Sequence, residues 1–182
     1  MTTVHREIQI DCGHRVPDHA SKCRSPHGHR YRIIATCGGE VLSEPGNPEN
    51  GMVIDFGNIK MAMMDVLDGI FDHAFVISHQ DTMMMDWYFP GEDPNKVLQR
   101  FNAEIDRQLS AYGIEGNAIQ LPRGVDGYKA VPVNYTPTAE NMARHMFDLM
   151  DKALNHRTNE LRLINIRLYE TPNCYVDYER AA

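Results

Sequence analysis

The chain has 182 residues, of which 42% are hydrophobic and 24% charged, a composition typical of a globular domain with a core of its own. Its net charge of −7 argues against a general nucleic-acid-binding protein. No apolar run approaches the roughly 18 residues of a membrane span, and the opening residues lack the apolar core of a signal peptide. We therefore expect a single cytoplasmic domain over residues 1–182.

Charge is distributed unevenly along the chain. Residues 1–36 hold six Lys or Arg against three Asp or Glu, a balance of +3, which leaves −10 for the remainder. Five of the nine histidines also fall in this opening segment. The pattern suits a basic patch that meets a small anionic substrate, and it suits a solvated strand face equally well. The four cysteines are scattered, so in a reducing compartment we expect free thiols.

The first two predicted elements are strands. Over residues 4–12 the apolar side chains alternate with polar ones and share their face with His14. A loop rich in turn-forming residues follows, and residues 27–37 form the second strand, with His27 and His29 on one face.

The middle of the chain alternates between clear and weak patterns. We expect a short strand over residues 52–56, and then an amphipathic helix whose apolar stripe runs from Ile59 to Ile70, with Asp55 or Asn58 as its cap. A second helix should begin at Asp93-Pro94. The rest of residues 78–135 has the composition of a surface excursion.

The C-terminal part predicts one helix and one long strand. A helix should open near Thr136–Asn141, with proline close to its start. Residues 161–170 form a strand whose one face carries Ile164, Ile166, Leu168 and Glu170, and residues 175–178 can resume it. Strands at both ends with helices between them indicate an α+β fold, an antiparallel sheet with helices on one face.

Three histidines have the spacing of a metal site. His27 and His29 project from the same strand face, and His14 lies on the preceding strand across a predicted hairpin. A His-x-His pair alone is a weak signal, because such a pair is often polar surface. Three imidazoles with an open fourth position fit a catalytic zinc better than a structural one.

Cys23 lies in the loop four residues before the histidine pair, between Lys22 and Arg24. Cationic neighbours favour the reactive thiolate form of a cysteine. The residue could be a fourth zinc ligand, an inert thiol, or a catalytic base or nucleophile. As a ligand it would close the metal site and argue against catalysis.

Two further features carry carboxylates. Asp72-His73 follows the first helix, where it could be a solvated cap or, if it approaches Cys23, a proton relay in which Asp72 raises the basicity of His73. Glu170 ends an apolar strand face, and a half-buried carboxylate needs donors. A guanidine-like ring edge with two parallel N–H groups would suit it, and so would a neighbouring arginine at the rim.

Six segments in order resemble the 6-pyruvoyl-tetrahydropterin synthase / 6-carboxy-tetrahydropterin synthase family. They are Asp11–Arg15, Cys23-x3-His27-Gly28-His29-x-Tyr31, Gly51–Phe56, Phe71–His73, Pro137–Asn141 and Tyr169–Pro172. The resemblance covers nearly the whole chain except residues 80–130. It departs from the family's pattern at Ile10, where phenylalanine is usual, and after His73, where the chain continues Ala74–Ser78.

The resemblance implies a tunnelling fold, that is, a four-stranded antiparallel sheet with two helices on one face. It also implies a ring-forming homo-oligomer, commonly a hexamer, and it makes residues 80–130 a helical insertion. His14, His27 and His29 match the zinc ligands, and Cys23 matches the catalytic cysteine with Asp72 and His73 as partners. The residues that match the pterin pocket are Glu170, which anchors the amino-pyrimidine edge, and Thr138 and Glu140 near it.

The three residues between Cys23 and His27 resemble the queuosine-pathway branch of the family. That branch implies conversion of 7,8-dihydroneopterin triphosphate to 6-carboxytetrahydropterin, acetaldehyde and triphosphate. A 6-pyruvoyl-type synthase and a non-catalytic pterin-binding module are the alternatives. From charge alone, Lys22, Arg24 and Arg15 are candidates to meet the phosphates. We expect no membrane or nucleic-acid partner.

Overall fold

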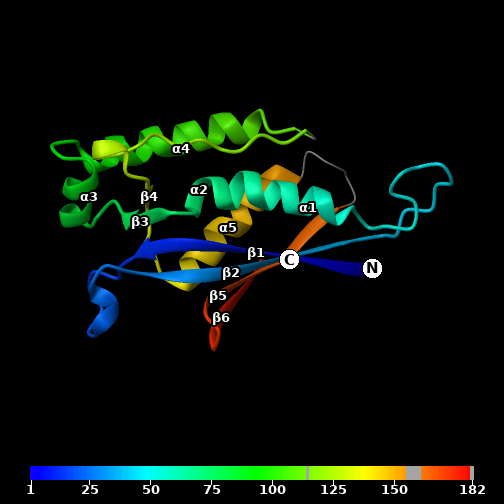
Figure 1. Ribbon diagram of the computed structural model, residues 1–182, viewed down its shortest axis with the longest axis horizontal. Coiled ribbons are helices and arrows are strands. Elements are labelled where there is room, and N and C mark those ends of the chain that lie inside the picture. Colours follow the sequence, from blue (N-terminus) through cyan, green and yellow to red (C-terminus); the bar gives the residue numbers. More distant parts are fainter. Residues whose placement is uncertain (114, 155–160, 181–182) are drawn as a thin grey trace.

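The computed structural model describes residues 1–113, 115–154 and 161–180, whose strands form one six-stranded sheet in the order β4-β3-β1-β2-β5-β6 (Figure 1). The strands are β1 (Thr2–His14), β2 (His27–Gly39), β3 (Ala74–Ser78), β4 (Ala130–Val133), β5 (Arg162–Thr171) and β6 (Cys174–Glu179). The α-helices are α1 (Phe56–Ala62), α2 (Gly69–Phe71), α3 (Thr82–Tyr88), α4 (Pro94–Ser110) and α5 (Ala139–Leu154). None of the described helices is long and apolar enough to cross a membrane.

The observed sheet has two strands more than the predicted four-stranded antiparallel sheet. Strands β1, β2, β5 and β6 pair antiparallel as expected, but β3 pairs parallel with β1, and β4 pairs parallel with β3. The two added strands are short and almost entirely buried, so they lack the alternation of polar and apolar residues by which a half-exposed strand is recognised. The α+β class is confirmed, whereas the strand number and the purely antiparallel pairing are wrong.

The predicted faces of the first two strands are confirmed. On β1, Ile8, Ile10, Cys12 and His14 are buried, and on β2 the buried positions begin at Tyr31 and follow the same alternation. Helix α5 packs against β5 and β6, and the helix that begins with α1 packs against β1. The core therefore lies between this face of the sheet and these helices.

On β5 the predicted face is wrong at one residue. The pairing of β2 with β5 shifts between Thr36 and Cys37, where a β-bulge leaves Ile164 out of register. Leu163 is buried in its place, and Ile166 and Leu168 keep their predicted positions. The bulge does not alter the face of Glu170, because it lies earlier in the strand.

The first helix is continuous, and a π-helical turn over Met63–Asp68 joins α1 to α2. Asp55 caps it as predicted, since its carboxylate accepts a hydrogen bond from the Gly57 N–H at 2.6 Å. The predicted strand over residues 52–56 is wrong. The Met52 N–H donates to the Glu49 carbonyl in a turn, and Phe56 is already the first residue of the helix.

The segment 79–129 is more than a surface excursion. Helix α4 begins at Pro94 with Asp93 as its cap, as predicted, and it forms the outermost layer in Figure 1. After it, Ile119 and Leu121 are buried, and the Ile119 N–H donates to the Asp65 carbonyl of the π-helical turn at 2.9 Å. The segment then returns to the sheet as β4.

Candidate metal centre and the cavity beside it

His14, His27 and His29 form a cluster at the paired ends of β1 and β2. The antiparallel register sets His14 opposite His27 and Cys12 opposite His29. One potential ligand atom from each histidine lies within 4.8 Å of the other two. With metal–nitrogen bonds of about 2.1 Å, one ion can reach all three after small side-chain rotations. The structure therefore brings together the three residues that the spacing predicted.

Backbone carbonyls fix two of these rings in the tautomer that a metal ligand needs. The Nδ1 of His14 lies 2.6 Å from the Pro137 carbonyl, and the Nδ1 of His27 lies 2.8 Å from the Ser25 carbonyl. Each Nδ1–H can thus donate to a carbonyl, which leaves the Nε2 lone pair available. The Nε2 of His29 is buried without a hydrogen-bond partner. This orphaned nitrogen and the two fixed tautomers fit a divalent cation.

The environment of the cluster favours neutral imidazoles. Burial lowers the pKa of His14, of which only 2% is exposed, and burial likewise lowers the pKa of His29. The Tyr31 hydroxyl lies 3.2 Å from the Nε2 of His14, to which it can donate. Burial raises the pKa of Tyr31, so its hydroxyl stays protonated. An ion bound at the His14 Nε2 displaces this hydrogen bond.

A cavity of about 290 Å³ adjoins the cluster and gathers the predicted site residues from distant parts of the chain. Its lining includes His14, Cys23, Thr138, Glu140 and Glu170. Cys23 lies in the short 3-10 helix Lys22–Arg24 and is partly exposed. Among the described residues, its sulfur is not part of the ligand cluster, so a metal held by the three histidines would keep a position for another ligand.

Glu170 faces the histidines rather than the solvent. Its Oε1 lies 3.6 Å from the His14 Nε2 and 3.8 Å from the His29 Nε2, and its side chain is 30% exposed. Thr138 directly precedes helix α5, and its carbonyl accepts the Met142 N–H at 2.9 Å; Glu140 is exposed on the first turn of the helix. These three polar side chains line the same cavity as the thiol.

Asp72 and His73 form a close pair, but His73 lines a different cavity from Cys23. The Asp72 Oδ2 lies 2.5 Å from the His73 Nδ1, and this contact raises the pKa of His73. His73 lines a cavity of about 510 Å³ together with Gly13, Gly28 and Arg30, whose positions alternate with those of the cluster, and also with His29 and Lys129. Within the described part of one chain, the expected contact between this pair and the thiol is therefore not made.

The three candidate phosphate-binding residues differ in what they contact. The Arg15 guanidinium forms a bidentate ion pair with Asp81, a buried carboxylate that also caps helix α3, at 2.5 and 2.8 Å. Lys22 and Arg24 flank the thiol on the 3-10 helix and have no ion pair within the described chain. They are better placed than Arg15 to meet an anion.

Some residues of the site were not predicted from the sequence. Tyr31 shares the strand face of His27 and His29, so its alternation was a usable signal. The Pro137 carbonyl, in contrast, is a backbone contact between segments 123 residues apart, and no side-chain pattern predicts it. The cavity is also lined by Val16, His19, Cys174, Tyr175 and Val176.

The fold and the site together define a class of protein. The chain matches the family described as 6-pyruvoyl tetrahydropterin synthase over residues 3–181, and it belongs to that family. Solved structures agree on the tunnelling fold. An uncharacterized protein from Wolinella succinogenes superposes with a TM-score of 0.67 at 19% identity, covering 99% of this chain and 98% of that one. The 6-pyruvoyl tetrahydropterin synthase of Caenorhabditis elegans gives 0.56 at 21% identity, with 99% and 96% covered.

Curated relatives bear a more particular name. The 6-carboxy-5,6,7,8-tetrahydropterin synthase of Rickettsia felis is 31% identical over 172 residues, 94% of this chain and 96% of the relative. The protein of that name from Haemophilus influenzae is 25% identical over 179 residues, 98% of this chain and 99% of the relative. The helical insertion expected at residues 80–130, relative to shorter members of the family, stays a prediction.

Proposed function

We propose that this chain is a 6-carboxy-5,6,7,8-tetrahydropterin synthase. It would convert 7,8-dihydroneopterin triphosphate to 6-carboxytetrahydropterin, acetaldehyde and triphosphate, a step of 7-deazaguanine and queuosine biosynthesis. The observation that carries the proposal is the convergence of a three-histidine cluster, a thiol and a carboxylate on one small cavity in a chain of this family. The names of the curated relatives support the same activity.

Zinc is the metal that we assign to the cluster. Three neutral imidazoles, with no carboxylate or thiolate in the described ligand group, suit this borderline ion and leave room for substrate. His14, His27 and His29 would hold it. Bound zinc supplies Lewis acidity to the oxygen atoms of the substrate side chain.

The residues of the cavity would divide the remaining work. Glu170 would accept hydrogen bonds from the paired N–H groups of the amino-pyrimidine edge. Because its carboxylate is charged and partly buried, these hydrogen bonds would be stronger than neutral ones in water. Thr138 and Glu140 would line the same end. Cys23 would take a proton from the substrate side chain, and Lys22 and Arg24 beside it would meet the triphosphate.

Asp72 and His73 would serve as the second proton-transfer group. His73 and Cys23 line different cavities within one chain. The His73 side chain is 77% exposed, so it is accessible to another copy of the chain. We therefore propose a cytoplasmic homo-oligomer in which the pair of one copy approaches the thiol of another. A ring such as a hexamer would provide that contact around its circumference.

Incubation of the zinc-loaded protein with 7,8-dihydroneopterin triphosphate, followed by mass spectrometry of the products, tests the activity. The expected product is 6-carboxytetrahydropterin together with acetaldehyde. A product that retains the carbon side chain after loss of triphosphate would identify a 6-pyruvoyl-type enzyme instead.

Replacing the thiol separates catalysis from binding. We expect Cys23→Ala to lower kcat by about 100-fold or more, the usual range for a proton-transfer residue, while the zinc content stays at the wild-type value. Metal content by plasma mass spectrometry is the control, since it reports the cluster directly. Unchanged turnover would remove the thiol from the reaction and would favour a pterin-binding module or another base.

A further inference from the structure

The Asp72–His73 pair is held in an unusual backbone conformation. His73 has a φ of 54°, in the left-handed region that disfavours residues other than glycine. Two contacts with β1 hold it there: the Asp11 N–H donates to the Asp72 Oδ1 at 2.9 Å, and the His73 N–H donates to the Asp11 carbonyl at 2.7 Å. Such a conformation persists only when its surroundings impose it.

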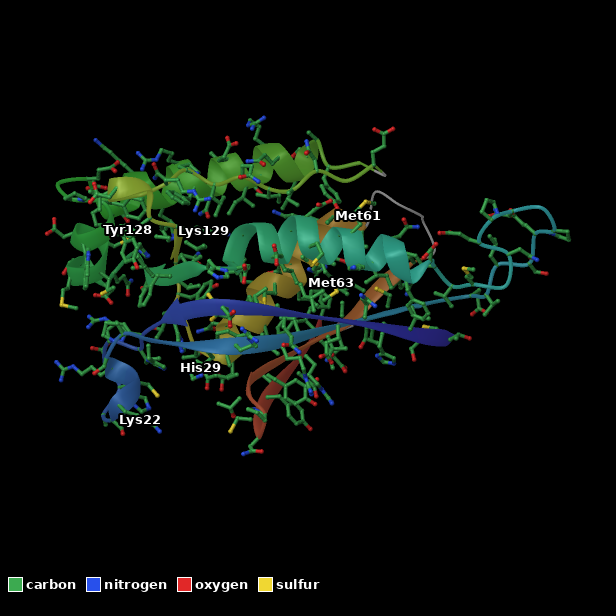
Figure 2. All side chains as sticks on the ribbon, in the orientation of Figure 1. Lys22, His29, Met61, Met63, Tyr128 and Lys129 are labelled. Atoms are coloured by element: carbon green, nitrogen blue, oxygen red, sulfur yellow. The ribbon has the colours of Figure 1, made fainter. Side chains whose placement is uncertain are left out.

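Lys129 contacts the chain on both sides of His73. Its Nζ donates to the Asp72 carbonyl at 2.7 Å, and its own carbonyl accepts the Phe75 N–H at 3.1 Å. One residue, 57 positions away from Asp72, thus contacts both ends of the four-residue stretch 72–75 that carries the exposed imidazole. Figure 2 shows Lys129 beside Tyr128 on the β3–β4 side of strand β1.

The backbone position of Lys129 is fixed by contacts within the segment 79–129 and between that segment and β3. The Gly124 N–H donates to the Tyr128 carbonyl at 2.9 Å. The Tyr128 ring packs edge-on against Tyr88, which stacks on Phe75 at a centroid distance of 5.8 Å. The aromatic contacts hold the residue before Lys129 against β3, so the backbone of Lys129 cannot move away from β3 without losing them.

The half-buried ammonium group has few alternatives to this contact. Burial and, next, the Arg123 charge lower the pKa of Lys129, while the nearby carboxylates of Asp72 and Asp68 act in the opposite direction. An ammonium group in such a place needs an acceptor, and the Asp72 carbonyl is the one within hydrogen-bond distance. The contact is therefore directional rather than a loose surface attraction.

We propose that Lys129 is a positioning residue for the Asp72–His73 pair, and that the segment 79–129 serves to deliver it. The assignment of a catalytic consequence rests on the proposed function. Lys129 does not touch the substrate in this scheme: it fixes the Asp72 carbonyl, and through it the orientation of the His73 ring.

The kinetic test compares Lys129→Met with Lys129→Arg and with Lys96→Met. Lys96 lies exposed on α4 in the same segment, so its replacement removes an equal charge without touching Asp72. We expect Lys129→Met to lower kcat by about tenfold with KM and zinc content unchanged, because a misplaced group slows only the chemical step. Lys129→Arg, which keeps a donor, should restore most of the loss, and Lys96→Met should match the wild type.

A structural test uses the His73 ring and needs no activity. Its pKa, followed by NMR, depends on Asp72 and Asp11, which raise it, and on Lys129, which lowers it, with Arg30 paired to Asp11 nearby. If Lys129 positions the pair, Lys129→Met weakens the Asp72–His73 contact and lowers the His73 pKa toward its ordinary value, and Lys129→Arg restores it. If the lysine acts only through charge, its removal raises the pKa, and that result or an unchanged pKa overturns the proposal.

The two tests fail independently. A wild-type protein without synthase activity, but with the expected NMR shifts, would contradict the proposed function and leave the positioning role intact. Lys129→Ala gives the same two readings if the methionine variant is insoluble, so the proposal is decided either way.

Discussion

The histidine cluster and the Asp72–His73 pair both present imidazoles, yet the chain builds and tunes them in opposite ways. The cluster follows from the register of two neighbouring strands, in which His14 pairs with His27. Burial lowers the pKa of His14 and His29. The pair is assembled by contacts with residues far away in sequence, and the Asp72 carboxylate raises the pKa of His73.

The difference separates two roles for one side chain. A buried imidazole that stays neutral can serve as a metal ligand, because its lone pair remains free for a cation. An exposed imidazole beside a carboxylate holds its proton more strongly and can deliver it. The pKa values of the two regions are therefore shifted in opposite directions, downward at His14 and His29 and upward at His73, which suits a metal site and a proton-transfer group respectively.

The largest effect should come from breaking the cluster. His14→Ala removes one of three ligands, and we expect zinc content to fall from about one per chain to near zero, with activity lower by more than about 100-fold. Metal analysis after dialysis measures it. His5→Ala is the matched control: His5 lies on the same strand, exposed, with a hydrogen bond to Thr36, and its loss should leave zinc bound. Zinc retained by His14→Ala would show that the ion binds elsewhere.

A smaller effect should come from the residue between the two regions. Gly13 lies beside His14, and a Cβ there would come within 2.6 Å of the Phe75 ring on β3. We expect Gly13→Ala to destabilise the protein by about 1–3 kcal/mol, measured by urea unfolding, because the ring must move from a packed position. At Gly113 nothing lies within 4 Å of the added atom, so Gly113→Ala should change stability by less than about 0.5 kcal/mol. Equal effects of the two substitutions would contradict the close approach of Phe75.

The smallest effect is a difference in titration, which sharpens the comparison directly. In the zinc-free protein, NMR should show His73 titrating above 6.5 and both His14 and His29 below it. Asp72→Asn should lower the His73 pKa, since the carboxylate is the largest cause of its shift. All three histidines titrating together would contradict the contrast.

The same shifts give opposite signs to the pH dependence of stability. The raised pKa of His73 contributes stability that is present below the unfolded-state pKa of about 6.5 and is lost as pH rises through the folded value. The lowered pKa values of His14 and His29 act the other way, so the zinc-free protein loses their contribution as pH falls below about 6.5. Bound zinc would strengthen the second dependence, because metal and proton compete for the same lone pairs and the metal is lost as pH falls.

The sequence predicted the cluster because its geometry is local. Alternation along β1 and β2 places His14, His27 and His29 on one face, and antiparallel pairing of neighbouring strands brings them together. The helix cap at Asp55 and the start of α4 at Pro94 are local in the same sense, and both are confirmed.

What the sequence did not predict depends on distant contacts. Strand β3 is parallel to β1 and buried, so its apolar run carries no alternation to distinguish it from a loop or a helix end. The bulge at Ile164 reverses one side chain, and no glycine or proline lies at that point of β5 itself; the glycine that leaves room for Ile164 is Gly38 on the paired strand. The Ile119 N–H donates to the Asp65 carbonyl of the first helix, and the Ile119 side chain is buried there. Nothing in the residues around Ile119 indicates that Asp65 is its partner.

Because of the π-helical turn over Met63–Asp68, the number of residues in the first helix determines whether residues 117–121 can dock on it. A π turn accommodates one residue more than an α turn, and here the Asp65 carbonyl is turned toward Ile119. Deleting a single residue within the turn would restore regular α winding and keep Ile70 and Phe71 on the same face, but it would remove the outward orientation of the Asp65 carbonyl that meets Ile119. Chimeras that exchange this helix with an ordinary one should therefore lose the docking of residues 117–121, even when every core side chain is kept.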